Sequence, residues 1–165
     1  MHEPPKQFDA LFRSAGWNGE KRCLPRNVPP SHPGFSIVEY YSGLHVHHET
    51  ATELGTDRRE VDIEFSECRP PLPTVAVWAT RLGVDLVGVA VFNAQYERLW
   101  IANDGRFFSS NDISSHFLFV GNNWHHAILS ILTFADRQEL LEQSTPAFPG
   151  DDRFYDWKLY IESAR

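Results

Sequence analysis

The chain has 165 residues, of which 42% are hydrophobic and 22% charged, and this composition suits one compact globular domain. The net charge of −7 argues against a nucleic-acid partner, because such binding needs cationic side chains that displace phosphate counterions. Two cysteines are too few for a disulfide scaffold, and no signal peptide or membrane-spanning run is apparent. We therefore expect a cytoplasmic protein with reduced thiols and no membrane partner.

The first half of the chain predicts two helices and two strands. Apolar residues recur at i, i+3, i+4 and i+7 in PPKQFDALFRSAGW, which indicates a helix that ends at Gly16. A second helix is expected in SHPGFSIVEYYSG, with Ser31 as its N-cap and Gly43 at its left-handed end. LHVHH then begins a short strand, and residues 60–65 alternate acidic and apolar side chains as a half-buried strand does.

The second half adds a short helix, three strands and a long helix. TVAVWATRLG predicts a helix that ends at Gly83, and DLVGVAVF, RLWIAND and GRFFSS predict strands, the last two joined by a turn at residues 103–105. NNWHHAILSILTFADRQELLEQ predicts the longest helix, capped by Asn122 or Asn123. The aromatic tail fits a strand or a helix, and the sequence leaves this open.

The order of these elements indicates the fold class. Strands cluster instead of alternating strictly with helices, which favours a single α+β domain with a mainly antiparallel β-sheet flanked by helices. No repeat or long linker divides the chain. We expect the domain to occupy residues 1–143 and residues 144–165 to form a C-terminal, aromatic-rich extension packed on the same domain.

The acidity of the chain is concentrated in one segment. Residues 49–67 hold seven acids and two bases, a net −5 out of −7. Within REVDIEFSE the acids alternate with apolar residues, so Glu60, Asp62 and Glu64 share one face of the strand. This face is either a solvated surface, or an edge that resists aggregation, or a surface for a cationic partner. A face that serves only solubility usually mixes signs, whereas a face of one sign attracts a partner.

The histidines are the main indication of an enzyme. His45 and His47 are two residues apart and point the same way in a strand, while His125 and His126 open the last helix. Together with the acids of 60–64 they suit a zinc or manganese site, as in a metal-dependent hydrolase. The simpler interpretation makes them surface groups or helix caps, and we expect no metal or other cofactor.

No recognisable catalytic motif accompanies them. The chain has no Walker loop, nucleophile elbow, paired-cysteine motif or zinc-binding HExxH helix. Asp62 and Asp104 could act as a carboxylate pair for hydrolysis, but nothing in the sequence brings them together, and Asp104 is better explained by a turn. We therefore expect no catalytic residues.

Several segments, in their order and spacing, resemble the SUKH superfamily, whose fungal members regulate cell-wall synthesis. SAGWNGEKR, FSIVEYYSGLHV, WATRLGVDLVGVAVF, LWIANDGRFF and NWHHAILSIL are similar to successive segments of its bacterial immunity-protein branch. The resemblance covers roughly residues 8–135. It departs at Ser42, where the branch has a second glycine, at Val87 and Gly88, where a Pro-Val-Gly-type turn is common, and in the tail after residue 143.

The resemblance implies a small cytoplasmic antidote without catalysis. Such proteins bind a cognate toxin domain, often a nuclease, and block its active face; a regulatory scaffold for an endogenous partner is the alternative. A basic nuclease groove would attract acids that mimic phosphates, which is our inference from charge. We expect the partner-binding residues to be Asp57, Glu60, Asp62, Glu64 and Glu67. The sequence leaves the toxin and the oligomeric state open.

Overall fold

The structure, a computed structural model, is built on one antiparallel sheet. It describes residues 3–51, 58–67, 73–111, 116–134 and 138–140. Seven strands lie in the sheet in the order of the chain, each antiparallel to the next. They are β1 (His45–Ala51), β2 (Arg58–Phe65), β3 (Leu86–Phe92), β4 (Glu97–Ala102), β5 (Phe107–Asn111), β6 (Phe117–Gly121) and β7 (Gln138–Glu139).

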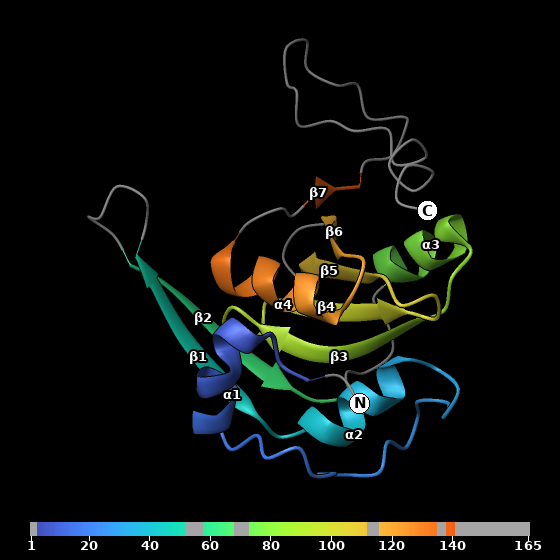
Figure 1. The fold of residues 1–165 in the computed structure, drawn as a ribbon. Helices are drawn as coiled ribbons and strands as arrows, with labels where there is room; N and C mark the ends of the chain where they lie inside the picture. The colour runs from blue at the N-terminus through green and yellow to red at the C-terminus, as the bar shows by residue number, and fades with distance from the viewer. Residues whose placement is uncertain (1–2, 52–57, 68–72, 112–115, 135–137, 141–165) are drawn as a thin grey trace.

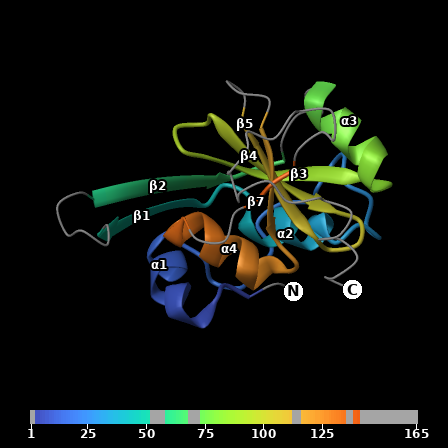
Figure 2. The ribbon, with the colours of Figure 1, turned by 90° about the horizontal axis from the view of Figure 1, so that it is seen from above.

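Helices cover the two faces of the sheet unequally. Three of them pack on one face and α3 packs on the other, as the view from above shows (Figure 1 and Figure 2). They are α1 (Asp9–Ser14), α2 (Gly34–Tyr41), α3 (Pro73–Leu82) and α4 (Trp124–Thr133), and a 3-10 turn, η1 (Lys6–Phe8), precedes α1. The predicted α+β class is confirmed, since strands and helices segregate into layers around one sheet.

Two apolar clusters hold these layers together. The larger lies between the sheet and α1, α2 and α4, and includes Phe12, Tyr41, Phe65 and Trp124. The ring centroids of Tyr41 and Trp124 are 4.9 Å apart, and burial raises the pKa of the Tyr41 hydroxyl. The smaller cluster joins α3 to β4, β5 and β6. It includes no residue of β1 or β2, so α3 leaves the same face of these two strands uncovered.

The first two helices end where the glycines predict. Gly16 and Gly43 both adopt the left-handed conformation, with φ of 94° and 78°. The predicted N-cap Ser31 is wrong, because α2 begins later, at Gly34. The imidazole Nδ1 of His32 accepts a hydrogen bond of 3.0 Å from the Gly34 amide, so a histidine contacts the first amide of this helix.

The last helix is shorter than predicted. Its cap is confirmed: the Asn123 side chain accepts a hydrogen bond from the His126 amide. The helix ends at Thr133 because Phe134 takes a left-handed conformation, with φ of 59°. Strand β6 precedes it and was not predicted from the sequence. The proposed extension, residues 144–165, lies outside the described part of the chain.

Candidate partner-binding face

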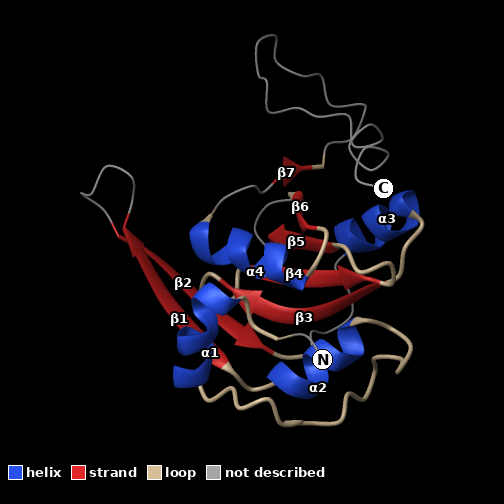
Figure 3. Cartoon of the chain, in the orientation of Figure 1, coloured by secondary structure: helices blue, strands red, loops and turns tan. Residues whose placement is uncertain are grey.

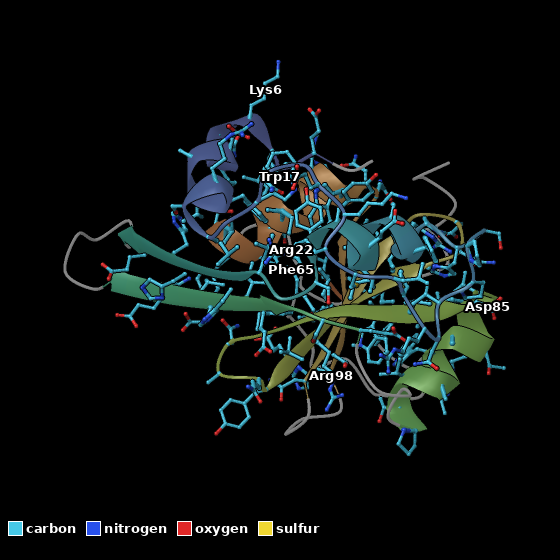
Figure 4. All side chains as sticks on the ribbon, turned by 90° about the horizontal axis from the view of Figure 1, so that it is seen from below. Lys6, Trp17, Arg22, Phe65, Asp85 and Arg98 are labelled. Atoms are coloured by element: carbon cyan, nitrogen blue, oxygen red, sulfur yellow. The ribbon has the colours of Figure 1, made fainter. Side chains whose placement is uncertain are left out.

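The alternation of β2 is present in the structure. Val61, Ile63 and Phe65 are fully buried under the helices, whereas Glu60 and Glu64 are exposed on the opposite face. Figure 3 shows β2 passing behind α1, and in Figure 4 Phe65 lies toward the side of α1 and α4 while Arg98 of β4 lies on the other side of the sheet. The carboxylates of β2 therefore share the face that carries α3 further along the sheet.

Strand β1 adds to the same face. Its residues His45, His47 and Glu49 stand directly opposite Glu64, Asp62 and Glu60 of β2. We call the four carboxylates of this surface, Glu49, Glu60, Asp62 and Glu64, the acidic face. Because β2 lies between β1 and β3, it is not an edge strand. Protection of an exposed sheet edge therefore does not explain its charges, and that interpretation is wrong.

Two imidazoles converge on one carboxylate oxygen in the acidic face. Oδ1 of Asp62 lies 2.8 Å from Nδ1 of His47 and 3.4 Å from Nε2 of His45. The second ring nitrogen of His47 lies 3.7 Å from Glu49. The hydrogen bond to Asp62 chiefly raises the pKa of His47, and the negative charges nearby add to the effect, although desolvation opposes it. Protonation of the His47 imidazole would partly neutralise the acidic face.

Two other charges of the acidic segment, Arg59 and Glu67, point elsewhere. The guanidinium of Arg59 lies over the Phe134 ring, 5.3 Å from its centroid, on the helix side of the sheet. Both carboxylate oxygens of Glu67 accept backbone hydrogen bonds, at 3.1 Å from Arg26 and 2.8 Å from Asn27. Glu67 thus fixes a loop, and its predicted role in binding stays a prediction. Asp57 lies outside the described residues.

The predicted enzymatic groups are spread over separate elements. His125 opens α4, and its Nε2 lies 3.1 Å from the Glu3 carbonyl. Partial burial would raise the pKa of Asp104, but hydrogen bonds from Arg106 outweigh this and hold the pKa below its usual value. Asp62 is engaged by histidines on another strand. Within the ranges that the structure describes, no three His, Cys, Asp or Glu residues form a metal-binding group.

Two surface hollows accompany these elements. The larger, of about 690 Å³, lies at the start of α4, where Asn123 caps the helix and His125 contacts the backbone of Glu3. The smaller, of about 230 Å³, adjoins the acidic face at the turn between β3 and β4.

The sequence did not predict the turn between β3 and β4. Asn93, Ala94 and Gln95 all have positive φ although none is glycine, so the usual turn signal is missing.

The geometry defines a small α+β domain with one half-covered sheet face. Comparison of the chain with protein-family models, with curated proteins and with solved structures found no match. The SUKH resemblance therefore stays a prediction. None of the helices in the described ranges is long and apolar enough to cross a membrane.

Proposed function

We propose that this protein is an antidote that binds a cognate toxin domain through the acidic face and blocks the toxin's basic active surface. The observation that carries this proposal is the gathering of four carboxylates from two paired strands on a part of the sheet that no described helix covers. Glu49 stands directly opposite Glu60, an arrangement that is unfavourable for the isolated fold. A cationic partner would relieve this repulsion. The domain would act by binding alone, without catalysis.

Electrostatics supports such a partner over a neutral one. Arg59 does not neutralise this face, because its guanidinium lies over Phe134 on the helix side of the sheet. A surface of one sign steers an oppositely charged protein, with association rates up to roughly 10⁸–10⁹ M⁻¹s⁻¹ at low salt, against about 10⁵–10⁶ for neutral partners. A nuclease toxin with a basic substrate groove has the complementary charge. We expect binding to weaken as salt rises.

A growth assay tests the proposal. The toxin domain encoded beside this gene is expressed in a susceptible cell, with and without the protein, and survivors are counted. We expect rescue by the wild-type chain. A triple variant, Glu60→Lys with Asp62→Lys and Glu64→Lys, should fold, as its circular dichroism would show, yet lose rescue and most of its affinity for the toxin.

A matched control separates location from total charge. The control is a second triple variant that changes the net charge by the same amount away from the acidic face. It carries Asp9→Lys, Glu20→Lys and Asp85→Lys. This control should rescue like the wild type. Full affinity in the folded acidic-face variant would refute the proposed surface. Absence of rescue by soluble, folded wild-type protein would refute the antidote role for that toxin and favour the regulatory scaffold.

A further inference from the structure

The smaller hollow lies where β1, β2 and the β3–β4 turn meet, at one end of the acidic face. Its volume is about 230 Å³, which can receive one long side chain but not a folded element. Its lining consists of His45, Asp62, Glu64, Val91, Phe92, Ala94 and Gln95. The hollow is therefore partly polar and partly apolar, and β1, β2, β3 and the turn all contribute to it.

The polar half offers two acceptors, Glu64 and Gln95, that are unpaired within the described residues. The carboxylate of Glu64 and the side-chain amide of Gln95 make no hydrogen bond or ion pair with any residue that the structure describes. Although His45 stands opposite Glu64 in the strand register, its Nε2 approaches Asp62 instead, at 3.4 Å. A donor that entered the hollow would meet the Glu64 carboxylate and the Gln95 carbonyl oxygen together.

The apolar half fits the stem of the same side chain. Val91 of β3 and Ala94 of the turn line it with hydrocarbon, while the ring of Phe92 belongs to the larger apolar cluster on the helix side. Arginine and lysine bury their methylene stems against such surfaces while their charged ends reach polar groups. Arg98, the cation opposite Val91 on β4, does not line the hollow. Among the residues that the structure describes, no lysine or arginine lines the hollow.

The walls of the hollow are already connected. The amide of Asn93, at the start of the turn, donates a hydrogen bond of 3.1 Å to the Asp62 carbonyl of β2. The Asn93 side chain donates a second bond of 2.7 Å to the Glu97 carboxylate at the start of β4. These bonds tie the turn to both neighbouring strands, so little rearrangement is needed before a ligand binds.

We propose that this hollow binds one arginine side chain of a protein partner. The stem lies along Val91 and Ala94, and the guanidinium donates to Glu64 and Gln95. A planar guanidinium with several donors matches two separated acceptors better than the single ammonium of lysine does. As a deepening of the proposed function, the subsite rests on that function for its biological partner, although its chemistry can be tested without one.

A nuclear magnetic resonance titration of the full chain provides the test. The probes are capped Gly-Arg-Gly, its lysine analogue, and the analogue with citrulline, which has nearly the shape of arginine but no charge. We expect saturable binding of the arginine peptide with a roughly millimolar Kd, and amide shifts concentrated at residues 62–64 and 91–95. Lysine should bind more weakly and citrulline weakest of the three.

Glu60 supplies a matched control, since it is an exposed glutamate on the same strand and face but does not line the hollow. Glu64→Gln should weaken binding of the arginine peptide about five- to tenfold, as expected for one hydrogen bond between charged groups at an open site. Glu60→Gln should change it less than about twofold. Equal losses in the two variants, equal binding of citrulline, or no saturation would overturn the subsite.

The titration contains no toxin, so the two proposals can fail separately. A negative titration beside successful rescue would leave the acidic face as the toxin surface without a dedicated arginine site. A positive titration with no rescue would keep the arginine site and remove the antidote role.

Discussion

If the acidic face serves a partner, its charges should cost the isolated fold some stability. The clearest place to measure this is the cross-strand pair of Glu49 and Glu60, which stand directly opposite each other. Replacing Glu60→Gln removes the repulsion, and Glu60→Lys replaces it with attraction. Both changes fall on an exposed position with no core contact, so the response should be electrostatic.

The expected magnitude follows from the geometry. Cβ atoms of directly opposed residues lie about 4.5–5.5 Å apart, which places the two charges at about 6 Å. Coulomb's law in water gives about 0.7 kcal/mol for that separation, so the change from repulsion to attraction is worth about 1.4 kcal/mol before screening. Screening reduces it to about 1 kcal/mol at 0.01 M salt, about 0.6 at 0.15 M and about 0.2 at 1 M. Glu60→Gln should give about half of each value.

Urea unfolding measures these differences without adding ions. The experiment is done near pH 8.5, about two units above the ordinary pKa of imidazole, because a protonated His47 close to Glu49 would offset part of the repulsion. We expect stability in the order Glu60→Lys, Glu60→Gln, wild type, with the spread shrinking as salt rises. A Glu60→Lys protein no more stable than wild type, or a gain that salt leaves unchanged, would refute the reasoning. The stabilised variant should also inhibit the toxin less well.

Two further predictions concern β1 and β2. The raised pKa of His47 means that its protonated form stabilises the fold, so this contribution is complete below about pH 6.5 and is lost as pH rises through the folded-state pKa. Titration of the His47 imidazole by nuclear magnetic resonance should give a pKa above 6.5, and Asp62→Asn should lower that pKa. A pKa that Asp62→Asn leaves unchanged would contradict the hydrogen bond. Phe65→Ala removes a fully buried ring from beside Tyr41 and Trp124 and should cost about 3–5 kcal/mol in urea unfolding; a loss below about 2 kcal/mol would show that the site collapses or is loosely packed.

Local signals in the sequence predicted most of the elements. The alternation in residues 60–65 and the glycines at the helix ends depend on the steric preferences of a few neighbouring residues. Both features are present in the structure as predicted. The end of α4 did not follow from such signals, because ADRQELLEQ favours a helix while Phe134 turns the chain in the structure. The positive φ values at Ala94 and Gln95 were equally hidden, since no glycine marks them.

The candidate site was only half predictable for a different reason. The sequence placed Glu60, Asp62 and Glu64 on one face, and it connected His45 and His47 with these acids only as a possible metal site. The cross-strand register joins the two groups, and register depends on pairing between segments that are distant in the chain. The hollow required a third partner, the β3–β4 turn, which only the folded sheet brings next to β2.

The position of these strands explains why the acids can be there at all. The smaller apolar cluster under α3 includes no residue of β1 or β2, and Glu49, Glu60 and Glu64 on their outer side are exposed. Any polar residue would satisfy the requirement for contact with water at these positions. Threonine or alternating charges would do so without placing Glu49 against Glu60. The pairing of like charges is therefore a choice that solvation does not impose. A cationic partner is the simplest physical reason for it, and the Glu60 series measures directly how much stability the isolated protein gives up.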